Sequence, residues 1–266
     1  MVIIGGGGLL HAHEQWSAQI LRYCQVAGRC IVWSPGRNLH HARAAPMTPD
    51  NVLLQTAAAA TVRDKLFADN ARPLHVVTML DASCLHPGLD GCSAPRDDRL
   101  AGLHPVAAYM HASQKSTGLG SQLKGLPHLQ NSHRGNACPI FDFMCKALVL
   151  VSSSYHGALW GTYLGRRVLL PPQTFSEKFE LMPFGPLPRF TTLESARLLA
   201  ANGSLPNPDG LAVRDECRRQ NTAFYKKHVE PFVRDVLQCS ARPEKHAVAA
   251  CEPMQAEDAT GHGGPG

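Results

Sequence analysis

Residues 148–172 constrain the fold of this 266-residue chain more than any other segment. The segment opens with the apolar run LVLV, which is typical of a strand buried on both faces of a parallel sheet. Three serines interrupt the run, and residues 155–164 predict a short helix that Gly165 ends. Residues 168–170 predict the next strand, which two prolines stop. This β–α–β unit predicts an α/β fold built on parallel sheets.

The carboxyl end of the first of these strands carries the residues that point most clearly to chemistry. Ser152, Ser153 and Ser154 follow the apolar run, and His156 lies in the first turn of the predicted helix. Open α/β sheets bind ligands at strand carboxyl ends, and a helix amino terminus favours an anion. We therefore predict that His156 is catalytic and that Ser153 and Ser154 bind substrate. The alternatives are a structural histidine and serines of which one caps the helix.

Composition narrows the class of partner. The net charge is +5, with a pI near 8.8, and no compact run of lysine and arginine occurs. This balance fits an anionic small molecule or sugar phosphate better than duplex DNA. No apolar run approaches the ~18 residues of a membrane span, and we recognise no signal peptide. We predict a cytoplasmic protein, with the Golgi or secretory pathway as the alternative if the amino terminus is incomplete.

The nine cysteines and fourteen histidines show no metal-ligand spacing. Neither CxxC nor HExxH occurs, so we predict no metal site and no cofactor. We predict reduced and mostly buried thiols instead of a disulfide framework. Cys84 and His86 share one irregular loop, and a structural role is favoured there over a catalytic pair.

The amino-terminal region also alternates between strand and helix patterns. Residues 1–4 resemble the end of a strand, followed by a glycine run. We predict strands at 30–34 and 75–79 and helices at 9–24 and 50–65, the last from an Asp50 N-cap and an alanine-rich centre.

Two parts of this region are candidate ligand contacts. Gly6, Gly7 and Gly8 would let the backbone approach a ligand closely, although a tight turn is the alternative. Arg37 follows a predicted strand and is a candidate anion contact, with a solvated loop arginine as the alternative.

The remaining chain predicts a second α/β unit. We predict strands at 106–110 and 126–129 and helices at 138–147, 193–201 and 211–238, the last interrupted by Pro231. His111 follows a strand and is a candidate substrate contact. Lys178 is predicted near the same sheet edge, as a phosphate contact or a solvated lysine. Trp160 and Tyr163 fit the spacing of a helix core.

The polar stretch 91–103 is the best candidate linker. We therefore predict a partial Rossmann-like domain over 1–102 and a second Rossmann-like domain with a closing helix over 103–239. Residues 240–266 predict a disordered tail.

Five segments, in this order, resemble the polysaccharide pyruvyl transferase family: GGGGLL, SCLHPGLD, VSSSYHGALWGTYLGRRV, FSEKF and ECRRQNTAFYKKHV. The resemblance covers roughly residues 3–236, and SYHGALWGTYLGRRV is its most specific part. It implies a GT-B-like fold of two Rossmann-like parallel-sheet halves facing a cleft, with the amino-terminal half truncated. Family enzymes commonly carry an arginine two residues before the histidine of this block, where this chain has Ser154.

The resemblance also implies a reaction. A pyruvyl group would pass from phosphoenolpyruvate, as donor substrate, to two hydroxyls of a glycan sugar and form a ketal. Protonation of the donor's methylene carbon needs an acid, and a histidine exchanges protons near neutral pH. Two other functions stay open: a GT-B-like glycosyltransferase that uses a nucleotide sugar, and a non-catalytic remnant of the fold.

Overall fold

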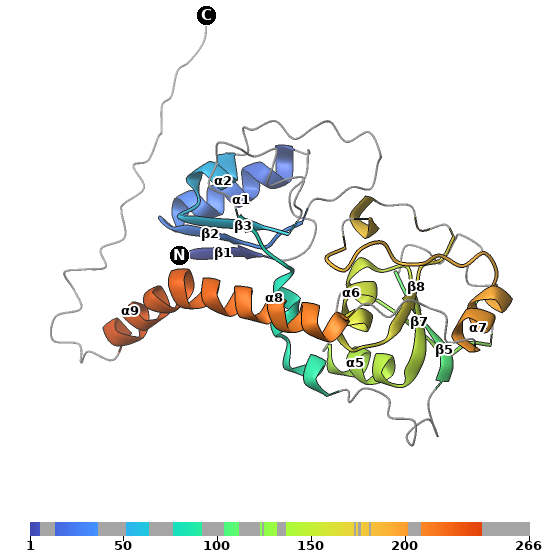
Figure 1. Cartoon of the computed structure of the whole chain (residues 1–266). Coiled ribbons are helices and arrows are strands. Elements are labelled where there is room, and N and C mark those ends of the chain that lie inside the picture. The colour runs from blue at the N-terminus through green and yellow to red at the C-terminus, as the bar shows by residue number, and fades with distance from the viewer. Residues whose placement is uncertain are drawn as a thin grey trace, which may run out of the picture.

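The computed structural model describes two four-stranded parallel sheets with helices packed against them, which confirms the predicted α/β class (Figure 1). The residues that it describes are 1–5, 14–36, 52–63, 77–91, 104–111, 123, 125–131, 137–172, 174, 177–180, 182–201 and 209–240. The glycine run from residue 6, most of the predicted linker and nearly all of the predicted tail lie outside these ranges.

The first sheet is formed by the amino-terminal part of the chain. Its strands are β1 (Val2–Gly5), β2 (Cys30–Trp33), β3 (Ala59–Val62) and β4 (Val77–Thr78), with helices α1 (Glu14–Val26) and α2 (Val52–Thr56). The spatial order is β1-β2-β3-β4, and all pairs are parallel. Right-handed crossovers between successive neighbours place their helices on one face of a sheet. Residues of α1 and α2 accordingly share one core with this sheet.

The predicted helix over 50–65 is wrong in its second half. Helix α2 ends at Thr56, and the alanine run leads into β3, where Ala59 pairs with Ile31 and Ala60 with Val32. Helix propensity is a weak preference that tertiary contacts override, and here pairing with a neighbouring strand decides the outcome.

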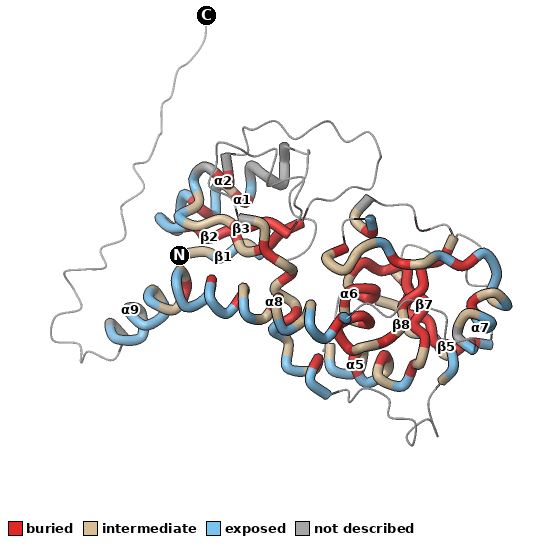
Figure 2. The backbone as a smooth tube through the Cα atoms, viewed as in Figure 1, coloured by how far each residue is buried: buried red, intermediate tan, exposed pale blue. Residues whose placement is uncertain are grey.

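The second sheet contains both strands predicted within residues 148–172. Its strands are β5 (His104–Met110), β6 (His128–Gln130), β7 (Ala147–Ser152) and β8 (Arg167–Leu169), with helices α5 (Cys138–Cys145), α6 (Tyr155–Tyr163) and α7 (Leu193–Ala201). Strand β7, helix α6 and strand β8 confirm the predicted β–α–β unit to within one or two residues. Gly165 ends the unit's helix in the left-handed region, with φ of 70°. Figure 2 shows how strongly burial is concentrated in these elements.

The order of the second sheet is β6-β5-β7-β8, all parallel. The chain leaves β5 toward one side to form β6 and then returns to the other side to form β7. The strand order therefore reverses beside β5, and such a switch point is where open α/β sheets form their binding crevice.

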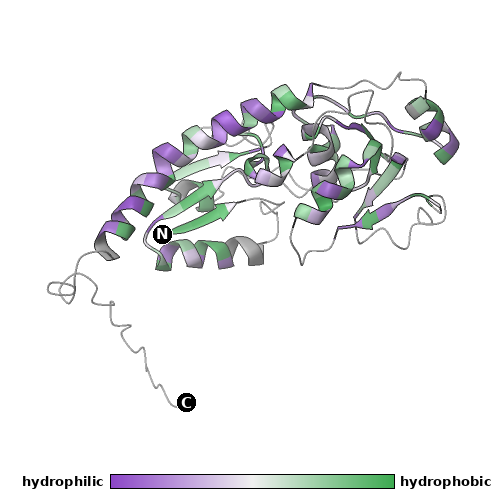
Figure 3. Ribbon diagram, turned by 90° about the horizontal axis from the view of Figure 1, so that it is seen from below, coloured by the Kyte–Doolittle hydropathy of each residue, from purple (hydrophilic) through white to green (hydrophobic). Residues whose placement is uncertain are grey.

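One long helical segment covers the other face of the first sheet. It consists of α8 (Gly210–Phe224), a π-helical turn η6 (Tyr225–Val229) and α9 (Glu230–Ser240). Figures 1 and 3 show this segment along the strands, with α1 on the opposite side. Phe224 and Val229 from the segment share a core with Ile31 from β2 and with Met79, which directly follows β4.

The predicted interruption at Pro231 takes the form of the π turn. Glu230 donates its backbone N–H to the carbonyl of Tyr225, five residues earlier. A proline has no N–H and its ring displaces the carbonyl four residues before it, so a wider turn accommodates it without breaking the helix.

Short 3-10 turns follow two of the strands. They are η1 (Ala82–Leu85), η2 (Pro87–Asp90) and η5 (Glu177–Phe179). The prediction of reduced thiols is wrong for Cys24 and Cys30, which form a disulfide because the end of α1 returns to the start of β2 with their Cα atoms 5.0 Å apart. It is also wrong for Cys145, which is disulfide-bonded as well. None of the helices that the structure describes is both long enough and apolar enough to cross a bilayer.

Candidate functional site

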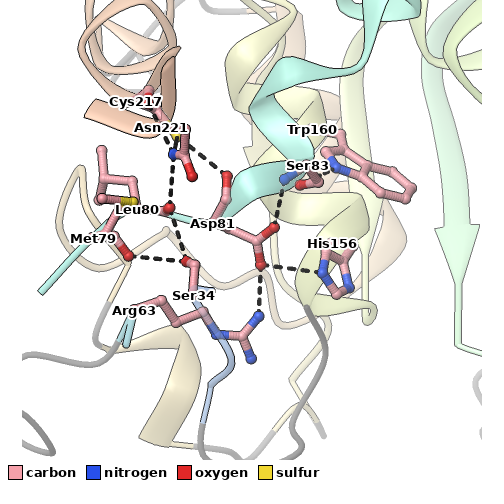
Figure 4. Close-up of polar contacts among 10 residues, drawn as sticks. All are labelled: Ser34, Arg63, Met79, Leu80, Asp81, Ser83, His156, Trp160, Cys217 and Asn221. Atoms are coloured by element: carbon pink, nitrogen blue, oxygen red, sulfur yellow. Dashed lines mark hydrogen bonds and ion pairs between the residues drawn. The ribbon is translucent and has the colours of Figure 1, made fainter. Parts of the chain in front are cut away.

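Three side chains from the two sheet regions meet at strand carboxyl ends (Figure 4). Arg63 directly follows β3, Asp81 lies three residues after β4, and His156 lies in the first turn of α6. Arg63 donates from Nη1 to Asp81 Oδ2 at 2.8 Å, and His156 Nε2 lies 3.3 Å from the same oxygen. One carboxylate therefore links a cation of its own half to the imidazole of the other half.

The carboxylate of Asp81 is held in its ionised form. Burial alone would raise the pKa of Asp81, whose side chain is only 3% exposed. The contact with His156, the charges of His156 and Arg63, and the N–H of Ser83 outweigh burial and hold that pKa well below its usual range. The surroundings of this carboxylate are therefore rich in positive charge and hydrogen-bond donors.

Local structure fixes Asp81 and its neighbours in place. Asp81 is the N-cap of η1, and its Oδ1 accepts the N–H of Ser83 at 2.9 Å. The hydroxyl of Ser83 accepts the indole N–H of Trp160, on α6, at 2.9 Å. The guanidinium of Arg63 lies over the ring of Tyr155, 4.3 Å from its centroid, and this cation–π contact orients it.

His156 lies between two aromatic rings and remains accessible. Its ring centroid is 5.6 Å from that of Tyr155 and 5.3 Å from that of Trp160. Its side chain is 32% exposed, so a ligand can reach the imidazole. The arrangement fixes the ring while leaving it open to proton exchange, as a general acid requires.

A cavity of about 260 Å³ adjoins this cluster and lies between the two halves. Its walls come from the residue after β3, from β4 and the turn after it, from α6, and from the loop after η5: Arg63, Thr78, Leu80, Asp81, Tyr155, Leu159, Tyr163, Met182 and Pro183. Ordinary small-molecule sites occupy roughly 300–1,000 Å³. This cavity therefore suits a compact ligand of a few carbon atoms.

The serines after β7 bond to backbone groups. Ser154 is the N-cap of α6, and its hydroxyl accepts the N–H of Gly157 at 3.3 Å. This confirms the alternative that one of the serines caps the helix. Ser153 accepts the N–H of His111 at 3.0 Å, across the switch point between β5 and β7. The structure thus brings His111 and Ser153 together beside α6. Substrate contacts of Ser153, Ser154 and His111 stay predictions.

The other predicted contacts are less central. Lys178 lies in η5, with Nζ 5.8 Å from the ring centroid of Phe179, which itself packs against Tyr155. Its contact with phosphate stays a prediction. Gly6, Gly7, Gly8 and Arg37 lie outside the described residues.

Sequence reasoning missed Asp81 and Arg63. Asp81 follows the strand predicted at 75–79, so the strand-end rule that selected His156 would also have selected it. Arg63 was hidden by the incorrect helix over 50–65. In the described part of the chain, no group of three or more His, Cys, Asp or Glu side chains could hold a metal ion.

No protein-family model matches this sequence, and no curated protein matches it at a significant level.

Proposed function

We propose that this protein transfers a pyruvyl group from phosphoenolpyruvate to two hydroxyls of a glycan sugar, with its two Rossmann-like halves in a GT-B-like arrangement. The observation that supports this best is the position of His156. An accessible imidazole at the carboxyl end of β7 is held by the buried carboxylate of Asp81 from the other half, beside a compact cavity. The sequence resemblance to polysaccharide pyruvyl transferases points to the same chemistry.

The chain's residues fit the proton transfers that the reaction needs. His156 gives a proton to the donor's methylene carbon, which leaves positive charge on the neighbouring carbon. One sugar hydroxyl adds to that carbon and returns a proton to the imidazole. The bond to phosphate breaks, the second hydroxyl closes the ketal, and its proton leaves with the phosphate. Asp81 acts as a positioning residue that orients the imidazole of His156.

The size of the cavity beside His156 supports this function over the nucleotide-sugar alternative. A cavity of about 260 Å³ lies below the usual volume of drug-sized ligand sites and accommodates a three-carbon donor. A nucleotide sugar is several times larger and would have to bind mostly outside it. The compact donor is therefore the better match.

Phosphate release tests the proposal. Purified protein is incubated with phosphoenolpyruvate and a panel of glycosides that carry neighbouring hydroxyls, and free phosphate and the ketal product are measured. Replacing His156 with alanine should lower the rate by about 10²–10⁴-fold, the usual contribution of an acid–base residue. Circular dichroism should show an unchanged fold.

His128→Ala is the matched control, because His128 is an exposed histidine on β6, outside the cluster. It should keep the wild-type rate. Phosphate release in the His156→Ala variant at the wild-type rate, or no ketal with any glycoside, would contradict the proposal.

A further inference from the structure

A second and larger cavity, of about 570 Å³, lies between the first sheet and the helical segment that covers it. The alanines at 58–60 line it on the sheet side, and Ala223 lines it on α8. Small side chains on both layers leave open a space that larger ones would fill. Arg63 and Asp81 line the smaller cavity and not this one, although Thr78 lines both. The volume lies within the roughly 300–1,000 Å³ that is usual for small-molecule sites.

Two rings form the aromatic part of the cavity wall. They belong to Phe224 and His228, and their centroids are 4.8 Å apart. Burial, followed by the charges of Lys227 and Arg29, lowers the pKa of His228, so its ring is uncharged at neutral pH. Uncharged rings beside alanine side chains suit the apolar face of a planar ligand. A pyranose would leave several of its hydroxyls unpaired against these walls.

The rim of the cavity is positively charged. Lys227 lines it, and in the described part of the chain its ammonium group forms no ion pair. Arg219 also lines the cavity, but its Nη2 lies 2.6 Å from Glu216 Oε1, so this pair adds little net charge. The charges that act on His228 are those of Lys227 and Arg29, both positive. The potential at this rim therefore favours an anion.

Polar groups at the cavity wall suit the edge of a heteroaromatic ring. Gln220 donates from Nε2 to Glu216 Oε1 at 2.7 Å, which fixes its amide. Among the described residues no group donates to the amide oxygen of Gln220, so this oxygen is available as an acceptor. The hydroxyl of Thr78 can both donate and accept.

We infer that this cavity binds a nucleoside monophosphate, with the base against the alanines and the rings of Phe224 and His228, and with the phosphate at Lys227. Lysine is a common phosphate ligand because its ammonium group is a compact charge with three donors. The site lies on the α8 side of the first sheet, apart from the cavity beside His156. Its occupancy does not depend on pyruvyl transfer.

Isothermal titration calorimetry of the full chain with AMP, adenosine and inorganic phosphate tests the inference. AMP should bind the wild type. Adenosine and inorganic phosphate should each bind about tenfold or more weakly, because each lacks one of the two parts that the site recognises. Ala223→Leu should abolish AMP binding, because the larger side chain occupies the cavity. Ala212→Leu makes the same change at an exposed position of α8 outside the cavity, and it should bind AMP like the wild type.

A pair of lysine variants tests the position of the phosphate. Lys227→Gln should weaken AMP binding about five- to tenfold and leave adenosine binding unchanged, since only a contact with the charged group is lost. Lys226→Gln removes the same charge from the preceding exposed residue, which does not line the cavity, and it should bind AMP normally. His156→Ala should also bind AMP normally. Circular dichroism checks that all variants are folded.

Four outcomes would overturn the inference. These are a wild type that does not bind AMP, or that binds adenosine or inorganic phosphate as tightly, an Ala223→Leu variant that binds AMP like the wild type, equal losses in the two lysine variants, and loss of AMP binding in His156→Ala. The last would place the nucleotide in the smaller cavity. AMP binding that depends on Ala223 and Lys227, with no ketal formed from any glycoside, would overturn the proposed function and leave the inference standing.

Discussion

The carboxylate of Asp81 would be costly to bury alone, and its neighbours show how the fold offsets that cost. Arg63, which follows β3, and His156, on α6, both contact Oδ2 of Asp81. The backbone N–H of Ser83 donates to Oδ1. Removing one partner from a buried ion pair usually costs far more than the intact pair contributes. Asp81 therefore orients His156. The same contact connects the turn after β4 to the second half.

Replacing Asp81 with asparagine should lower the free energy of unfolding at pH 7 by about 3–5 kcal/mol, because Arg63 loses its buried counter-charge. The pH dependence should change as well. The pKa of Asp81 lies lower in the folded chain than its ordinary value of 3.8, so the stabilisation is complete above that value and is lost as pH falls below it. Urea unfolding followed by circular dichroism between pH 3 and 7 measures both effects.

Asp142→Asn is the control for this prediction, because Asp142 is an exposed aspartate on α5. It should unfold like the wild type across this range. An Asp81→Asn variant that matches the wild type at pH 7, or that loses stability as steeply below pH 4, would show that the carboxylate is not stabilised in this way.

At the scale of elements, the sequence predicted well where local pattern and tertiary packing agree. The apolar run, the capping serine and Gly165 all specify the β7–α6–β8 unit, and the structure confirms it. The alanines that enter β3 have a local preference for helix, and only pairing with β2 reveals the strand.

The same division explains the candidate site. The rule that ligands bind at strand carboxyl ends selected His156, His111 and Ser153. The rule identifies residues within one half and does not show which residues of the other half they contact. Arg63 and Asp81 become neighbours of His156 only when the halves dock, because Asp81 and His156 are 75 positions apart in the sequence. No local pattern encodes that distance.

Close packing of α6 on the second sheet leads to a prediction for Gly157. A Cβ at this position would lie 2.3 Å from Tyr109 Cδ1 and 2.5 Å from Ser152 Oγ. Gly157→Ala should lower the free energy of unfolding by about 1–3 kcal/mol, since overpacking outweighs the gain of about 1 kcal/mol in helix propensity. Chemical denaturation measures the difference.

Gly91→Ala is the comparison, because a Cβ there meets nothing closer than 3.5 Å. Its stability should stay within about 0.5 kcal/mol of the wild type. A Gly157→Ala variant as stable as the wild type would mean that α6 can move away from β5 and β7 without loss.

At the scale of the whole molecule, side-chain hydrogen bonds attach α8 to the first half. Asn221 is fully buried on this helix. Its Oδ1 accepts the indole N–H of Trp33 at 2.7 Å, and its Nδ2 donates to the carbonyls of Leu80 and Cys217 at 3.0 and 2.9 Å. Figure 4 shows this amide beside the strand end that carries Asp81. The helix that follows the second half in sequence therefore helps to place the first half's part of the site.

Asn221→Ala should lower the free energy of unfolding by about 2–4 kcal/mol, because it leaves the half-buried N–H of Trp33 and the carbonyl of Leu80 without this partner. Thr222→Ala, at the exposed next position, should change stability by less than about 0.5 kcal/mol.

A double-mutant cycle then asks whether α8 and Asp81 act as one unit. If the Asn221 amide holds the segment that positions Asp81, the variant with both Asn221→Ala and Asp81→Asn should lose less stability than the sum of the single variants, by about 0.5–3 kcal/mol. The same cycle with Thr222→Ala should be additive. Additivity in the Asn221 cycle would mean that the helix stabilises the first sheet without positioning the carboxylate, and His156 would then depend on contacts within the turn after β4 alone.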